Sequence, residues 1–134
     1  MIRSLSIILP VYNESLRLHL SMNEIKKFAK KNIFNSVEII FVDDGSKDDS
    51  LKKINEFVGK FRKNKKIKIL KIKSYKNLGK GSALKYGVKK SSKEWIVTVD
   101  VDMSVKLSQI ITWIKKGYIK NKNSAYFGSR KHQK

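Results

Sequence analysis

Short apolar runs alternate with amphipathic stretches along the chain, and this alternation limits the folds that the sequence can adopt. The runs are rich in Ile, Val, Leu and Phe, whereas the stretches between them repeat apolar residues every three or four positions. A continuous apolar run is typical of a strand buried on both faces of a parallel sheet. Parallel neighbours need a crossover connection, which is usually a helix. The pattern therefore predicts an α/β fold with a mainly parallel sheet flanked by helices.

The boundaries of the expected elements follow from the same pattern. Strands are expected at Ser4–Pro10, Val37–Val42, Ile67–Ile72, Trp95–Val99 and Ala125–Phe127. Helices are expected at Ser15–Lys31, Asp49–Lys63, Gly79–Lys90 and from Leu107 to Tyr118. The third strand alternates with lysine, as an outer strand would, and the fourth is expected to be buried. We expect Asn13 or Ser15 to cap the first helix, and Gly87 to allow close packing of the third.

Composition excludes several classes of protein. The chain has no cysteine, which rules out disulfides, thiolate zinc sites and a cysteine nucleophile. No apolar run approaches the about 20 residues that a membrane-spanning helix needs. The 134 residues suffice for one domain with one core. We expect a protein of the cytoplasm or of the cytoplasmic face of a membrane.

The net charge of +20 favours anionic partners. The excess is mostly lysine, with few arginines and little aromatic interleaving, so no specific nucleic-acid partner is expected. A peripheral contact with an anionic membrane surface fits this composition. A general lysine bias of the sequence would produce the same charge, and both interpretations stay open.

Polar residues follow the expected strands, where open parallel sheets bind their ligands. After the first strand, Pro10 precedes Tyr12, whose ring offers a face to a nucleotide base, and Glu14, which can accept the polar edge of the base. After the second strand come Asp43 and Asp44. One interpretation of these two acids is a simple turn and helix cap. In the alternative, the donor groups of a base or ribose offset the repulsion between the two carboxylates.

The segment Gly79-Lys80-Gly81 resembles a phosphate cradle. Glycines let backbone N–H groups approach phosphate oxygens, and the lysine adds a positive charge. It is not a dinucleotide fingerprint, because the third glycine would fall at Leu84, and it lacks the residue order of a P-loop.

The acids of Asp100-Val101-Asp102 suggest a metal site. In an extended segment, side chains two residues apart point the same way, so both carboxylates can share Mg²⁺ or Mn²⁺ and bridge it to a diphosphate. A solvated acidic turn is the alternative. Arg130, after the last expected strand, is either a surface charge or a forked clamp for phosphate oxygens.

Together these motifs resemble family 2 glycosyltransferases. The resemblance is carried by Ile8–Glu14, Phe41–Ser46, Asn77–Gly81 and Asp100–Asp102, and the segment Tyr126–His132 is most similar to the dolichyl-phosphate β-glucosyltransferase branch. It implies a GT-A fold, a nucleotide-diphospho-sugar donor, a divalent metal and inverting transfer. The implied roles are nucleotide binding for Pro10, Tyr12, Glu14 and Asp44 with Asp43 close by, donor phosphate or sugar contacts for Gly79 and Lys80, metal binding for Asp100 and Asp102, and catalysis for Asp102 and Arg130.

The resemblance also predicts the reaction. We expect transfer of glucose from UDP-glucose to a polyprenyl or dolichyl phosphate, with GDP-mannose as an alternative donor. The alternatives are a saccharide or protein acceptor, and a fragment that binds nucleotide sugar without catalysis. Family members usually have alanine where this chain has Val101, and they continue past Lys134 with a segment that builds the acceptor side. Residues 1–134 are therefore expected to be the donor-binding part of a GT-A domain.

Overall fold

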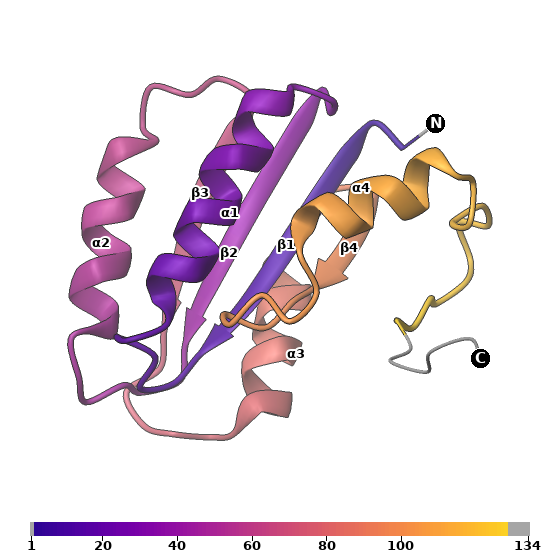
Figure 1. Cartoon of the computed structure of the whole chain (residues 1–134). Helices are drawn as coiled ribbons and strands as arrows, with labels where there is room; N and C mark the ends of the chain where they lie inside the picture. The colour runs from indigo at the N-terminus through magenta and orange to yellow at the C-terminus, as the bar shows by residue number, and fades with distance from the viewer. Residues whose placement is uncertain (1, 129–134) are drawn as a thin grey trace.

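The computed structural model describes residues 2–128, which form a parallel sheet with helices on both faces (Figure 1). The strands are β1 (Ser4–Val11), β2 (Ser36–Asp43), β3 (Ile67–Lys73) and β4 (Trp95–Thr98), arranged in the order β3-β2-β1-β4. Each neighbouring pair is parallel. The predicted α/β class, with a parallel sheet flanked by helices, is confirmed.

Helices cover the two faces of this sheet unequally. The helices α1 (Leu18–Lys31), α2 (Ser50–Lys60) and α4 (Leu107–Lys115) lie over one face, and α3 (Lys80–Lys90) packs on β1 and β2 from the other (Figure 1). The larger core cluster joins α1, α2 and α4 to alternate residues of the strands, such as Ile7 and Ile39. A smaller cluster under α3 contains Ile8, Ile40 and Ala83. Because β1 and β2 are buried on both faces, their sequences are nearly continuous apolar runs.

The packing of α3 depends on Gly87, as the sequence predicts. A β-carbon at this position would lie 2.4 Å from Cγ2 of Ile8 and 3.3 Å from Cγ2 of Val42. The helix backbone therefore lies directly on the two central strands. Gly81 in the same helix has no such neighbour within 4 Å.

The expected start of the first helix is wrong. The helix α1 begins at Leu18, and neither Asn13 nor Ser15 caps it. Instead, the backbone N–H groups of Arg17 and Leu18 both donate to the carbonyl of Glu14 at 2.9 Å, so a turn precedes the helix. The side chain of Asn13 accepts a hydrogen bond from the backbone of Lys47, in the segment after β2, which removes it from any capping role.

Two further expectations about strands are wrong. The strand β4 is an edge strand that leaves Ile96 42% exposed, rather than a buried one. Residues 125–127 form no strand. There the ring of Tyr126 packs near Trp95, with ring centroids 6.2 Å apart. Its hydroxyl accepts hydrogen bonds from the backbone N–H groups of Lys120 and Asn121. These side-chain contacts, rather than pairing with a strand, hold this segment.

We predict different effects of alanine at the two glycines of α3. Gly87→Ala should lower the free energy of unfolding by about 1–3 kcal/mol, because the new methyl group overlaps Ile8. Gly81→Ala, the matched control, should be neutral or stabilising by up to about 1 kcal/mol, because alanine has the higher helix propensity. Urea unfolding followed by circular dichroism measures both. Equal stability of the two variants would contradict the close packing of α3.

Candidate functional site

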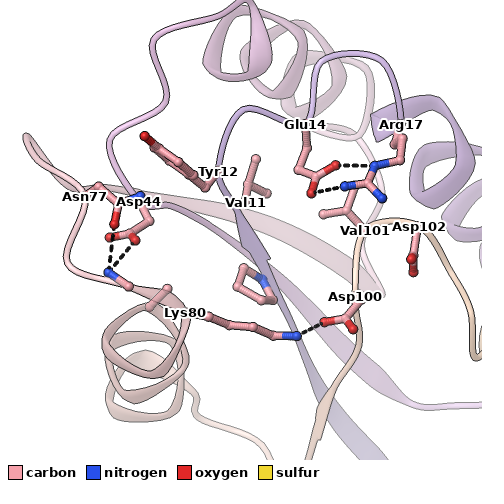
Figure 2. Close-up of a pocket in the computed structure, with 13 residues that line it drawn as sticks. Val11, Tyr12, Glu14, Arg17, Asp44, Asn77, Lys80, Asp100, Val101 and Asp102 are labelled. Carbon is pink, nitrogen blue, oxygen red and sulfur yellow. Dashed lines mark hydrogen bonds and ion pairs between the residues drawn. The ribbon is translucent and has the colours of Figure 1, made fainter.

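A cleft of about 340 Å³ opens at the carboxyl ends of the strands (Figure 2). It brings together most of the site residues predicted from the sequence, although they come from segments far apart in the chain. The predicted residues that line it are Pro10, Tyr12, Glu14, Asp44, Gly79, Lys80, Asp100 and Asp102. This convergence follows from the parallel sheet, which places the ends of neighbouring strands at one edge.

Two predicted site residues are not part of this cleft as described. Asp43 is only 1% exposed and does not line it. Both of its carboxylate oxygens are buried and have no hydrogen-bond partner among the described residues. Since side chains alternate along β2, Asp43 points to the same face as Phe41, which packs in the larger core. Arg130 lies outside the described residues, so its predicted role and that of Asp43 stay predictions.

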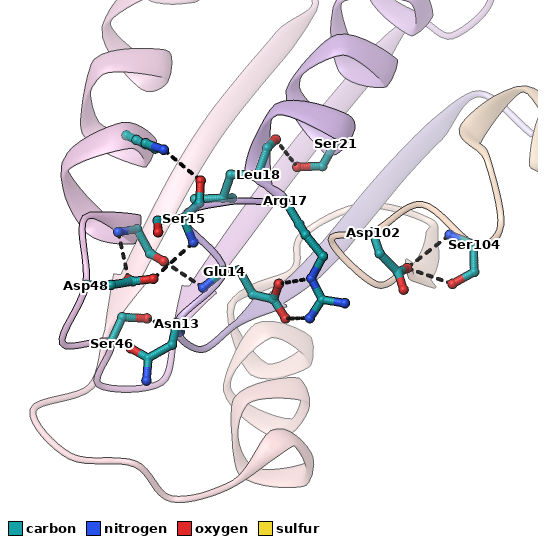
Figure 3. A network of polar contacts seen from close by, with 12 residues as sticks. Asn13, Glu14, Ser15, Arg17, Leu18, Ser21, Ser46, Asp48, Asp102 and Ser104 are labelled. Carbon is teal, nitrogen blue, oxygen red and sulfur yellow. Dashed lines mark hydrogen bonds and ion pairs between the residues drawn. The ribbon is translucent and has the colours of Figure 1, made fainter.

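The segment after β1 forms the rim of the cleft and is fixed to the segment after β2 (Figure 3). Asn13 has a positive φ of 50°, which turns the chain sharply just after Tyr12. Its backbone N–H donates to Oγ of Ser46 at 2.9 Å. The backbone N–H of Glu14 donates to Oγ of Ser50, also at 2.9 Å. Tyr12 is left 43% exposed at the cleft, where its ring can stack on a planar ligand.

Asp48 completes this connection between the two segments. It accepts hydrogen bonds from the backbone N–H groups of Ser15 at 3.1 Å and Ser50 at 2.9 Å. Burial opposes its ionisation, but the hydrogen bonds from Ser50 and Ser15 outweigh burial and lower the pKa of Asp48 from 3.8 to about 2. The charged carboxylate therefore holds the rim together near neutral pH, and this stabilisation is lost as the pH falls from about 4 toward 2.

Asp44 holds the glycine-containing loop that forms another wall. Its two carboxylate oxygens accept hydrogen bonds from the backbone N–H groups of Leu78 at 3.0 Å and Gly79 at 2.8 Å (Figure 2). The next residue, Gly45, has a φ of +78°, and a β-carbon there would lie 2.7 Å from the carbonyl carbon of Lys76. Asp44 and Gly45 thus bring the segment after β2 into direct contact with the segment before α3.

Arg17 is a cleft residue that the sequence reasoning missed. Its guanidinium donates two hydrogen bonds, each of 2.7 Å, to the two carboxylate oxygens of Glu14 (Figures 2 and 3). The hydrogen bond and charge of Glu14 raise the pKa of Arg17 further above its usual value. The spacing of an acid and an arginine three residues apart was the available signal. Without the position of α1, however, that signal does not show that Arg17 faces the cleft.

The two acids of Asp100-Val101-Asp102 lie in a turn, so the expectation of an extended segment is wrong. The N–H of Met103 donates to the carbonyl of Asp100 at 3.0 Å, and Met103 has a φ of 54°. Oδ1 of Asp102 accepts from the backbone N–H and hydroxyl of Ser104 at 3.0 and 2.6 Å. Oδ1 of Asp100 lies 2.5 Å from Nζ of Lys80. Both carboxylates nevertheless line the same cleft.

The donor set of the cleft fits a divalent cation that a substrate helps to bind. Among residues 2–128, no group of three or more His, Cys, Asp or Glu side chains could hold a metal ion alone. Mg²⁺ typically binds through one or two carboxylates, with substrate phosphates and water as its other ligands. Asp100 and Asp102 supply hard oxygen ligands of this kind. They are two of the chain's 11 acidic residues, and Glu14 and Asp44 place two more at the same cleft.

A family model for glycosyl transferase family 2 matches residues 6–130. The chain belongs to this family. A dolichyl-phosphate beta-glucosyltransferase of Dictyostelium discoideum is 35% identical to it over 134 residues, which cover 96% of this chain and 40% of the relative. The chain thus spans less than half the length of this family 2 relative.

Solved structures share the fold. The complex of S. aureus TarS 1-349 with UDP aligns with a TM-score of 0.64 at 23% identity, over 86% of this chain and 33% of TarS. The mannosyltransferase PcManGT of Pyrobaculum calidifontis, in complex with GDP-Man and Mn²⁺, aligns with a TM-score of 0.61 at 19% identity, over 73% of this chain and 27% of that protein. These likenesses confirm the predicted GT-A fold.

We predict that the two adjacent acids of this family 2 chain contribute differently. Asp44→Asn leaves one acceptor oxygen for two backbone N–H groups, so we expect the free energy of unfolding to fall by about 1–3 kcal/mol. Asp43→Asn replaces a buried carboxyl that has no partner among the described residues, so we expect no loss of stability. Urea unfolding measures both variants. A larger loss for Asp43→Asn would show that Asp43, rather than Asp44, is the structural acid.

Proposed function

We propose that residues 1–134 form the donor-binding part of a glycosyltransferase that moves a sugar from a nucleotide diphosphate to a lipid phosphate. The favoured reaction is inverting transfer of glucose from UDP-glucose to a dolichyl or polyprenyl phosphate. The observation that carries this proposal is the convergence of Tyr12, Glu14, Lys80, Asp100 and Asp102 on one cleft. An aromatic ring, a lysine and paired carboxylates are the groups that a base, a diphosphate and its cation require.

Different residues of the cleft are placed to bind different parts of the donor. Tyr12 and Pro10, at the end of β1, are placed to bind the base. Asp44 holds the backbone of Gly79 and so shapes the wall that receives the ribose and phosphates. Lys80 is placed to contact the phosphates as a mobile positive charge.

Asp100 and Asp102 are the proposed ligands of Mg²⁺ or Mn²⁺. When bound, the cation neutralises charge that builds on the leaving nucleoside diphosphate. We assign catalytic roles to Asp102, as one of these ligands, and to Arg130, beside the donor. A lipid phosphate acceptor already carries an anionic oxygen, so the chain needs no carboxylate base to activate it.

The relatives support this assignment without fixing the donor. The Dictyostelium relative is named for dolichyl phosphate and glucose, whereas the structural neighbours bind UDP or GDP-Man. UDP-glucose is therefore favoured, and GDP-mannose is the alternative donor. A saccharide or protein acceptor is the alternative to the lipid phosphate.

A second candidate function is binding of nucleotide sugar without transfer. The observation in its favour is that every cleft residue with an assigned role serves the donor or its cation. Both functions predict donor binding, and only the first predicts release of UDP or GDP when acceptor is added. Mass spectrometry of the products with a short-chain polyprenyl phosphate distinguishes them.

We predict metal-dependent donor binding that needs Asp102. Calorimetric titration with UDP-glucose should show binding that Mn²⁺ strengthens, and Asp102→Asn should weaken it at least tenfold only when Mn²⁺ is present. GDP-mannose is titrated in parallel to identify the nucleotide. Asp49→Asn, a change of the same kind at an exposed site that does not line the cleft, is the control. Equal binding by the Asp102 and Asp49 variants would contradict the proposal.

We also propose that the chain meets its acceptor at the cytoplasmic face of a membrane, through a basic surface around α3. Among residues 2–128, no helix combines the length and apolar character that a bilayer crossing requires. Residues 57–93 contain many lysines and no acid. Lys85 and Lys89 are exposed on α3, and so is the ring of Tyr86 on the same helix. Lysines beside exposed aromatic side chains are typical of surfaces that bind anionic membranes.

We predict that charge reversal on α3 releases the protein from vesicles. Wild type should sediment with vesicles rich in phosphatidylserine at low salt, and Lys85→Glu with Lys89→Glu should weaken this binding at least tenfold, because each lysine contributes about 1 kcal/mol. Lys26→Glu with Lys30→Glu changes the net charge equally on α1, which covers the opposite face of the sheet (Figure 1). Equal losses for both pairs would leave only a net-charge effect. Failure of wild type to sediment would remove the membrane proposal.

A further inference from the structure

The ion pair between Lys80 and Asp100 joins two walls of the cleft. Lys80 is the first residue of α3, and Asp100 lies just beyond β4. Nζ of Lys80 lies 2.5 Å from Oδ1 of Asp100, and Figure 2 shows the lysine side chain reaching along the cleft to it. The pair thus places a positive charge on the carboxylate that the proposed function assigns to a cation.

The other carboxylates of the cleft are held differently. Glu14 is bound by both arms of Arg17, and Asp44 by two backbone N–H groups. These contacts belong to the framework of the rim and the loop. The Lys80–Asp100 contact instead joins two walls of the cleft through side chains that are both about half exposed or more.

The ion pair is suited to exchange. The side chains of Lys80 and Asp100 are 61% and 49% exposed, respectively. An ion pair this exposed favours the paired over the separated side chains by about fivefold at most. An incoming ion can therefore displace it. An ammonium group and a divalent ion compete for the same carboxylate oxygen. Once displaced, the lysine has three donors and no acceptor, so it needs a new anion.

We propose that Lys80 occupies the place of the cation at Asp100, and that binding of the divalent ion with the donor diphosphate moves Lys80 from Asp100 onto the diphosphate. This inference rests on the proposed function, because it assumes a donor site that uses a metal. Lys80 then acts twice, since it weakens metal binding in the absence of nucleotide and strengthens nucleotide binding once the metal is present. The two ligands bind cooperatively because each removes a cost of binding the other.

Removing the lysine charge should therefore have effects of opposite sign. We expect Lys80→Met to bind Mn²⁺ alone about fivefold more tightly than wild type, because Asp100 has lost its competitor. The same variant should bind UDP about tenfold more weakly in saturating Mn²⁺, because a charged hydrogen-bond donor to the diphosphate is gone. A purely structural role for Lys80 would weaken both.

Paramagnetic resonance of free Mn²⁺ measures the first quantity, and calorimetric titration with UDP measures the second. Lys52→Met is the matched control, because Lys52 is exposed in the first turn of α2 and does not line the cleft, and it should leave both affinities unchanged. Lys80→Arg keeps the positive charge and should remain close to wild type in both. Circular dichroism melting checks that each variant is folded.

The outcomes separate this inference from the proposed function. Unchanged or weaker Mn²⁺ binding by Lys80→Met, with normal binding of UDP and Mn²⁺ by wild type, overturns the exchange and leaves the proposed function intact. Wild type that binds no UDP in the presence of Mn²⁺ contradicts both. Tighter Mn²⁺ binding with weaker UDP binding, absent from Lys52→Met, supports the exchange.

Discussion

The parallel pairing of β1 with both β2 and β4 is the constraint on which the cleft depends. In register, Ile8 lies beside Ile40 on one side and Thr98 on the other. The three strands therefore end at the same edge, and the chain after each of them begins there. The two core clusters on either side of β1 and β2 fix this register, because a shift by one residue would exchange the side chains of the larger cluster with those that pack under α3. The cleft therefore follows from the pairing of the core strands.

Hydrogen bonds between side chains and backbone convert these neighbouring strand ends into a shaped site. Asp44 binds the N–H groups of the loop before α3, and Ser46 and Ser50 bind those of the segment after β1. Each bond joins segments more than thirty residues apart. Loops without regular structure leave their backbone donors to be satisfied by other groups. Here the polar side chains after β2 satisfy them, which explains why this segment is rich in Asp and Ser.

Much of this arrangement was predictable from local pattern, and the failures have a common cause. The apolar runs identified β1 and β2, alternation with lysine identified β3 as an edge strand, and Gly87 marked the close packing of α3. The apolar run at Trp95 predicts a buried strand, because an apolar pattern does not reveal that β4 lies at an edge of the sheet. The start of α1 and the orientation of Arg17 depend on contacts with the segment after β2, which no local pattern contains. The turn at Asp100 depends on the positive φ of Met103, which is uncommon for a residue other than glycine.

Electrostatics act on two length scales in this chain. The net charge of +20 attracts anions over the molecule as a whole, but charges beyond about 8 Å are largely screened at physiological salt. Within the cleft, Glu14, Asp44, Asp100 and Asp102 outnumber the basic side chains of Arg17 and Lys80. A diphosphate drawn to the basic surface therefore meets an acidic wall at close range. On the proposed function, a divalent cation resolves this conflict, because it supplies the positive charge that the wall lacks and that the surface lysines are too distant to provide.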